Sequence, residues 1–266
     1  MSLYYKNIIK IMNLPTDIVR YALEFLDDEN LAKACMSSPE FSKKICNSNF
    51  WLKKIKERFP ELISPNYPGN EYINRYKGDN TYWAYYYNLS QLLNTKDLNN
   101  LFVNSVTSGR SDIVRILLKD TRVDPAIEKN TAIQNASYFG NTESVELLLS
   151  DPRVNPTANN NLAIHFASQN GHKDVVKLLL NDPRVDPSVD DNYPIRIASQ
   201  LGYPKMVKLL LKDIRVDPTV RDNEAIRRAS SNLHIEIVKL LLTDSRVYNS
   251  LSEEEREMYL AGFTRI

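Results

Sequence analysis

The segment Arg122-Val123-Asp124-Pro125 is repeated along the chain at a constant interval. The pattern begins again at Arg153, Arg184, Arg215 and, in shortened form, Arg246, so that each copy starts 31 residues after the previous one. A fixed interval of this size is typical of stacked supersecondary units, none of which can bury its apolar face alone. We therefore expect a repeat solenoid and not a single globular core.

Each repeat unit contains two stretches with the periodicity of an amphipathic helix. In the third copy, Pro194 suits the first turn of one helix, because its missing N–H would have no partner there. The second helix carries Val207, Leu210 and Leu211 at the i, i+3, i+4 spacing of a buried face. Gly202 lies between them, where a tight turn favours a positive φ. The fold class is therefore all-α, with a unit of helix, turn, helix and extended loop.

Two motifs in this unit resemble the ankyrin repeat. Residues 162–167 read Leu-Ala-Ile-His-Phe-Ala, which is similar to the family's Thr-Pro-Leu-His-x-Ala, and residues 171–180 read Gly-His-Lys-Asp-Val-Val-Lys-Leu-Leu-Leu. The resemblance implies an ankyrin solenoid that binds proteins. Because the period is about two residues short of the usual one, we expect a tight turn at each loop tip and not a β-hairpin. The recurring asparagines are expected to cap the first helices: Asn130, Asn161, Asn192 and Asn223.

The N-terminal part resembles a second family, the F-box. Leu14-Pro15-Thr16-Asp17-Ile18, the segment from Leu26 to Leu31, and Trp51 match the opening, middle and final tryptophan of that family. The resemblance implies docking onto the Skp-type adaptor of a cullin-based ubiquitin ligase. The residues that it places at this contact are Leu14, Pro15, Ile18, Val19 and Leu31. Alternatively, these helices only cap the first repeat.

The sequence predicts four regions. They are an F-box-like helical domain at 1–60, a loop and aromatic linker helix at 61–90, ankyrin repeats at 91–250 with a degenerate first repeat and four fuller ones, and a capping helix at 251–266. Ser252 and Glu255 have the spacing of a capping box, which favours a helix start at this point.

Composition narrows the possible partners and location. The 266 residues carry a formal net charge of +1, so no overall field favours nucleic acid or a membrane as partner. The apolar runs are shorter than the roughly 20 residues of a membrane span, and the first residues lack the layout of a signal peptide. Two cysteines suggest reduced thiols inside the cell. We expect a monomer in the cytoplasm. The pairing of the two families, with a composition rich in Asn, Ile, Lys and Tyr, resembles proteins of large DNA viruses, for which this would be the host cytoplasm.

Candidate chemistry is scarce. His165, His172 and His234 occupy positions where ankyrin histidines have structural roles, and no His, Cys or Asp spacing matches a zinc site. An aspartate lies two residues before each repeated arginine, as in Asp182 and Arg184, which suggests pairs that brace the turns and not acid–base dyads. We expect no catalytic, metal or cofactor site and no enzyme.

Positions that vary between repeats indicate where a target could bind, since they are free of packing duty. In ankyrin proteins the variable first-helix positions line the concave face, and here they form a mixed apolar and cationic patch. The expected target-binding residues are Asn135, Tyr138, Phe166, Gln169, Arg196, Ile197, Gln200, Arg227 and Arg228. The sequence thus predicts a substrate-recognition subunit of a ubiquitin ligase; a plain ankyrin scaffold and a decoy that only sequesters the adaptor are the alternatives.

Overall fold

The computed structural model describes residues 50, 53–54, 57–58 and 95–261. The chain divides into two compact units, residues 1–101 with 115–120, and residues 102–114 with 121–266. The five expected adaptor-binding residues and the aromatic linker helix lie outside the described residues, as do both cysteines. Where it is described, the first unit has helical residues, including Lys53 and Glu57, which form an ion pair with 3.5 Å between Nζ and Oε1.

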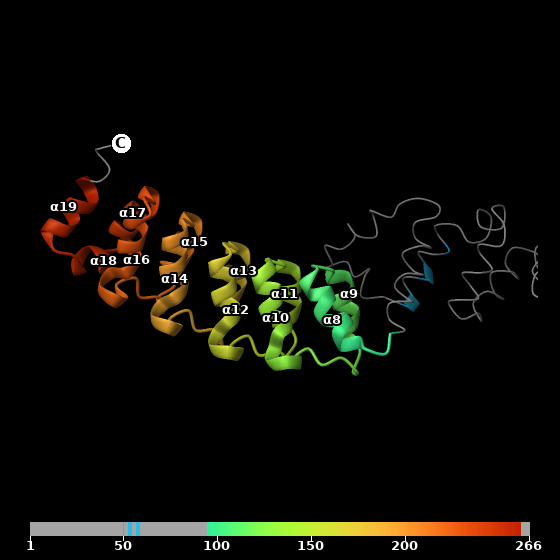
Figure 1. Cartoon of the computed structure of the whole chain (residues 1–266). Coiled ribbons are helices and arrows are strands. Elements are labelled where there is room, and N and C mark those ends of the chain that lie inside the picture. Colours follow the sequence, from blue (N-terminus) through green and yellow to red (C-terminus); the bar gives the residue numbers. More distant parts are fainter. Residues whose placement is uncertain (1–49, 51–52, 55–56, 59–94, 262–266) are drawn as a thin grey trace, which may run out of the picture. The chain divides into compact units, whose positions relative to one another are not determined.

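Helices are the secondary-structure elements throughout the described residues (Figure 1). The degenerate first repeat consists of α8 (Leu98–Thr107) and α9 (Ser111–Lys119). The inner helices of the four fuller repeats are α10 (Ile127–Phe139), α12 (Ala158–Gln169), α14 (Val189–Leu201) and α16 (Val220–Ser231). Their outer helices are α11 (Thr142–Leu149), α13 (Lys173–Asn181), α15 (Pro204–Leu210) and α17 (Ile235–Leu242). Two further helices follow, α18 (Ser245–Ser250) and α19 (Glu253–Ala261).

Neighbouring repeats pack layer on layer within the second unit. Each inner helix from α10 to α14 contacts the next inner helix and its own outer helix, and each outer helix from α11 to α15 contacts the next outer helix. One isoleucine per inner helix is at most 1% exposed, and small alanines beside it let the helices approach closely. These isoleucines are Ile133, Ile164, Ile195 and Ile226. Full burial of such a side chain contributes roughly 1.5–3 kcal/mol. Because the adjacent repeat provides part of this burial, the stability of each repeat depends on its neighbour.

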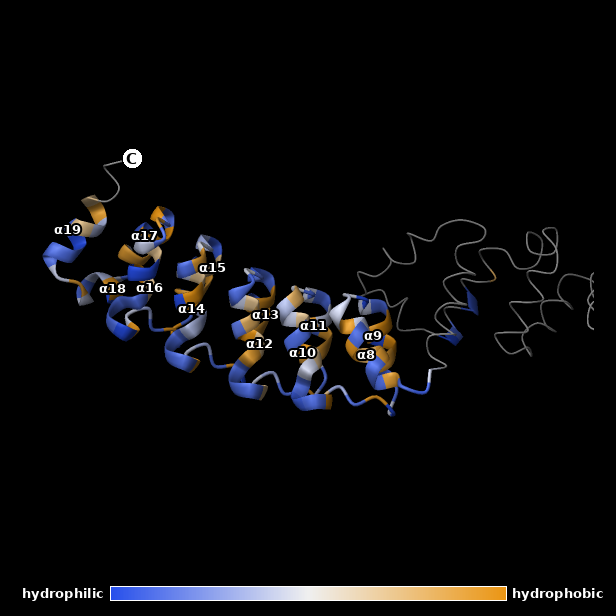
Figure 2. Ribbon diagram, in the orientation of Figure 1, coloured by the Kyte–Doolittle hydropathy of each residue, from blue (hydrophilic) through white to orange (hydrophobic). Residues whose placement is uncertain are grey.

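The loop tips are tight left-handed turns, as the short repeat period predicts. In each fuller repeat three consecutive residues have positive φ, for example Asp190, Asp191 and Asn192 with φ of 51°, 53° and 55°. These turns open α10, α12, α14 and α16, and they form the hydrophilic lower ends of these helices in Figure 2. Left-handed backbone costs about 1–2 kcal/mol per residue, less for Asn and Asp, so the surrounding bonds must hold the turns in place.

The expected role of the recurring asparagines was wrong. Their side chains do not cap the helix that they precede; they reach the following repeat. Asn192 Oδ1 accepts a hydrogen bond from the backbone N–H of Asp217 at 2.7 Å, and Asn130 and Asn161 make the same bond 25 residues ahead. The reason is that each asparagine lies in the left-handed turn and not at a helix N-cap, where the side chain would accept an N–H of its own helix.

The repeated Asp–Arg pairs brace the turns as predicted and also join adjacent repeats. Arg215 forms a two-bond pair with Asp213, with distances of 3.0 Å from Nε and 2.7 Å from Nη2. Its Nη1 donates to Val185 O of the preceding repeat at 2.8 Å. Arg153, Arg184 and Arg246 repeat this arrangement. The motif that sets the sequence period is therefore the clamp between repeats.

The turns between inner and outer helices use glycine and a ring from the next repeat. Gly140 has φ 74°, and a Cβ at this position would lie 2.5 Å from His172 Nδ1. His172 Nε2 lies 2.9 Å from Tyr138 O, and His234 makes the equivalent contact with Gln200 O at 3.0 Å. The structural role expected for both histidines is thus confirmed.

The last described helix begins as the sequence predicts. Ser252 N donates to Glu255 Oε2 at 2.8 Å, and Glu255 N donates to Ser252 Oγ at 3.2 Å, which is a capping box. In the part of the chain that the structure covers, the helices are too short or too polar to cross a membrane.

Candidate target-binding surface

The nine residues expected to bind a target all lie on the inner helices or their last turns. Helix α10 carries Asn135 and Tyr138, and α12 carries Phe166 and Gln169; α14 carries Arg196, Ile197 and Gln200, and α16 carries Arg227 and Arg228. Contacts between successive repeats bring some of them together: Tyr138 touches Phe166, and Arg228 donates to Gln200. We call this set the inner-helix face.

One end of the inner-helix face is aromatic. The rings of Tyr138 and Phe166 meet edge to face with centroids 5.4 Å apart, and Phe139 approaches Tyr138 in the same way at 5.0 Å. Tyr138 is 44% exposed and Phe139 is 52% exposed, whereas Phe166 is half-buried. We refer to these three residues as the aromatic cluster. The sequence reading missed Phe139; its position just before Gly140, at the exposed end of α10, was the available signal.

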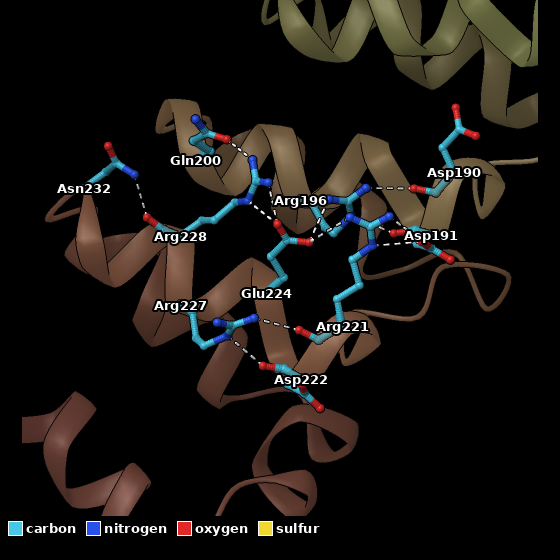
Figure 3. A network of polar contacts seen from close by, with 10 residues as sticks. All are labelled: Asp190, Asp191, Arg196, Gln200, Arg221, Asp222, Glu224, Arg227, Arg228 and Asn232. Atoms are coloured by element: carbon cyan, nitrogen blue, oxygen red, sulfur yellow. Dashed lines mark hydrogen bonds and ion pairs between the residues drawn. The ribbon is translucent and has the colours of Figure 1, made fainter.

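The other end carries a polar network centred on Glu224 (Figure 3). Glu224 Oε2 accepts a hydrogen bond from Arg196 Nη1 at 2.7 Å, and Oε1 accepts one from Arg228 Nε at 2.6 Å. Arg228 Nη1 also donates to Gln200. Glu224 was not identified from the sequence, although it breaks the run of uncharged residues found at the equivalent place in the other repeats.

Arg196 is buried and braces a tip turn. It is 5% exposed, and its Nε and Nη2 donate to Asp191 O and Asp190 O, both at 2.8 Å. Arg227 makes the same bonds to its own turn, to Asp222 O at 2.9 Å and Arg221 O at 2.8 Å. Both guanidinium groups therefore hold strained turn backbone in addition to any part in recognition.

Opposing effects set the ionisation of Glu224. Partial burial raises its pKa, but the hydrogen bond from Arg228 and the charge of Arg196 outweigh burial and leave the pKa below its ordinary value. Arg221 pairs with Asp191, with 2.7 Å between Nη2 and Oδ2. Glu224 is thus an ionised partner of Arg196 and Arg228, so these two arginines of the expected cationic patch are paired within the protein, whereas Arg227 donates to turn carbonyls.

His165 occupies the position of Gln134, Arg196 and Arg227 in the other repeats but does not make their bond. Gln134 Nε2 donates to Lys129 O at 2.8 Å, whereas His165 Nε2 is buried without a hydrogen-bond partner in the described part of the chain. Burial lowers the pKa of His165 against the opposing charge of Asp190, whose Oδ2 lies 3.6 Å from Nδ1. A neutral, enclosed ring of this kind fits a packing role.

Two further features bear on chemistry. The described residues include no group of three or more His, Cys, Asp or Glu side chains arranged to hold a metal ion. A cavity of about 300 Å³ lies at the end of the stack between α17, α18 and α19, away from the inner-helix face. Its lining consists of Lys239, Leu242, Thr243, Tyr248, Arg256 and Leu260.

Two family models match the chain. A model of ankyrin repeats in three copies matches residues 102–191 and 164–251, which together make up more than half of the chain. A model of the F-box domain matches residues 11–53. A comparison with curated proteins found no match.

Proposed function

The chain belongs to the ankyrin-repeat family and has an F-box ahead of its repeats, and from this premise we propose that it is the substrate-recognition subunit of a cullin-type ubiquitin ligase. Both modules bind other proteins, so the chain is a protein-interaction adaptor. In the proposal the F-box binds the Skp-type adaptor through Leu14, Pro15, Ile18, Val19 and Leu31, and the inner-helix face holds the target.

The observation that carries the proposal is the presence of two different binding modules in one chain. The F-box match ends at residue 53 and the ankyrin match begins at residue 102, so each module has its own segment of sequence. Linking two binding sites raises the effective concentration of one ligand near the other, to about the millimolar range for short flexible links. Catalysis would come from the partner subunits, and this chain would contribute proximity.

Gel filtration of the full chain with a purified Skp-type adaptor tests the first half of the proposal. We expect a complex that the double variant Leu14→Ala/Ile18→Ala does not form. Lys177→Ala, an exposed position on outer helix α13, is the matched control and should bind as the unaltered chain does. Absence of a complex with the unaltered chain, while circular dichroism shows intact helices, would leave a plain ankyrin scaffold.

A cellular experiment separates the ligase subunit from an adaptor-sequestering decoy. The triple variant Phe166→Ala/Ile197→Ala/Arg228→Ala alters the inner-helix face and leaves the F-box residues unchanged. For a ligase subunit we expect adaptor binding to persist while proximity-dependent ubiquitination of neighbouring proteins falls. If cellular activity survives this variant in full, the chain acts by occupying the adaptor.

A further inference from the structure

We infer that the segment of the target held by the inner-helix face is apolar and uncharged where it meets α10, α12 and α14. This inference rests on the proposed function, because it specifies the chemistry of the protein that the repeats would recognise. It departs from the sequence expectation of a mixed apolar and cationic patch, which would favour an acidic target.

Apolar side chains occur on the surface of three successive repeats and are open to solvent. Tyr138 and Phe139 on α10 and Leu201 on α14 are each at least 40% exposed, and Phe166 and Ile197 are half-buried between them in sequence. Clustered apolar side chains of this kind on a protein surface mark interaction sites more often than isolated ones do. Exposed aromatic rings that already hold each other in fixed geometry lose little freedom on binding and are frequent hot spots.

Two guanidinium groups next to this surface, those of Arg196 and Arg228, already have partners within the protein. All three donor nitrogens of Arg196 and all three of Arg228 have acceptors within the protein. Two carboxylates take part in this network: Glu224 pairs with Arg196 and Arg228, and Asp191 pairs with Arg221, whereas Arg227 donates to the turn carbonyls of Asp222 and Arg221. To pair with Arg196 or Arg228, an acidic target would have to displace Glu224, Gln200 or a turn carbonyl, and the broken bonds would cost about what the new ones contribute.

Apart from Arg227 on α16, which donates to its own turn, and the paired Arg196 and Arg228, the polar groups on and beside the face carry no charge. Gln169 on α12 and Ser231 on α16 are exposed, and Asn232 is exposed beside them, with its amide nitrogen bonded to Arg228 O at 2.8 Å. Amides and hydroxyls can donate to and accept from a peptide backbone without selecting for charge. Charge complementarity therefore favours an uncharged partner with aliphatic or aromatic side chains.

Selection from a random peptide library on the full chain tests the inference. We expect enriched peptides to be rich in Leu, Ile, Val, Met, Phe or Tyr and poor in Asp and Glu. Fluorescence anisotropy of the most enriched peptide should show an affinity that changes by less than about twofold between low and high salt, because screening acts on charge pairs. Tyr138→Ala, Phe139→Ala and Phe166→Ala should each weaken binding by about tenfold or more.

Two controls make the result specific. Arg228→Ala should weaken the same peptide by less than about threefold, and Lys177→Ala on α13 should leave it unchanged. Thermal unfolding of each variant excludes loss of fold, and Phe139, being 52% exposed, provides a variant with little structural consequence.

Three outcomes would overturn the inference. Acidic peptides whose binding is abolished by salt and by Arg228→Ala would show an acidic target. No enrichment, or peptides indifferent to all three aromatic variants, would show that the face is not a docking surface. Dimerisation of the chain that Tyr138→Ala abolishes would show that a second copy covers the cluster. Adaptor binding, measured on the same variants, reports separately on the ligase proposal, which can fail while this inference stands.

Discussion

Leu233 stands where each preceding repeat has a glycine in a left-handed turn. Its φ is 59° and it is 76% exposed, whereas a Cβ on Gly202 would lie 2.6 Å from the His234 ring. We expect Leu233→Gly to raise the free energy of unfolding by about 0.5–1 kcal/mol, because relief of strain exceeds the entropy that glycine adds to the unfolded chain. Urea unfolding of the full chain measures this.

The contrasting substitution is Gly202→Ala. We expect it to lower the free energy of unfolding by more than about 1 kcal/mol, because the new methyl group would strain the turn and clash with the ring of His234. Equal stability of the two glycine-site variants and the unaltered chain would show that these turns are not strained in solution.

His165 offers a second single-residue experiment. Replacing it by Gln, the residue at the equivalent position 134, allows a bond to its tip turn like that of Gln134 to Lys129 O and removes the buried unpaired Nε2. One such hydrogen bond contributes about 1 kcal/mol to the free energy of unfolding, and loss of the ring contact between His165 and Tyr193 removes about half of this contribution. We expect a net gain of about 0.5 kcal/mol by thermal and urea unfolding, whereas Gln134→Ala should lose about 1 kcal/mol.

At the scale of elements, the clamps between repeats should make stability depend on acid pH. Hydrogen bonds from Arg184, Arg215 and Arg246 lower the pKa of Asp182, Asp213 and Asp244 below the ordinary 3.8. As pH falls below 3.8, the unfolded chain takes up protons before the folded chain does. The contribution of these pairs is therefore present above that pH and is lost as pH falls through the lowered values.

Asp213→Asn isolates one clamp. At pH 7 we expect it to lower the free energy of unfolding by about 1 kcal/mol, because an amide keeps the shape but not the charge of the pair. The difference from the unaltered chain should shrink at about pH 3, where the aspartate of the unfolded chain is protonated. Asp174→Asn, at an exposed carboxylate on α13, is the control and should change stability little at either pH. If Asp213→Asn lowers the free energy of unfolding by the same amount at both pH values, the charge of Asp213 does not contribute to stability through its pair with Arg215.

At the scale of the whole molecule, the repeat stack was predictable and its surface chemistry was only partly so. The Arg-Val-Asp-Pro interval and the helical spacing of Val207 and Leu210 specify packing, which depends on residue type and spacing alone. The pairing of Arg196 depends on Glu224 in the next repeat, where Glu224 also pairs with Arg228 of its own helix, and such side-chain pairing across repeats cannot be derived from the pattern of one unit. The asparagines were misjudged for the same reason, since their acceptor role lies 25 residues ahead.

A stack stabilised by nearest neighbours should open locally when a terminal repeat is weakened. Ile226→Ala removes a side chain that is 1% exposed from α16 and should cost about 2–5 kcal/mol. We expect hydrogen exchange to accelerate in α16 to α19 while α10 to α13 keep their protection, because each repeat contacts mainly the adjacent ones. Uniform acceleration along all these helices would instead indicate one cooperative unit.

The clamps have a consequence for how such a chain changes over generations. Three of the recurring asparagines reach 25 residues forward, and four of the recurring arginines reach a carbonyl 30 residues back. Deleting or duplicating one full period therefore leaves matching hydrogen-bond partners on both sides of the junction. An insertion or deletion that is not a whole number of periods breaks both the asparagine and the arginine bonds at that point. Natural length variants are expected to differ by whole periods. Recombination at this spacing would lengthen the inner-helix face without requiring a new kind of contact between repeats.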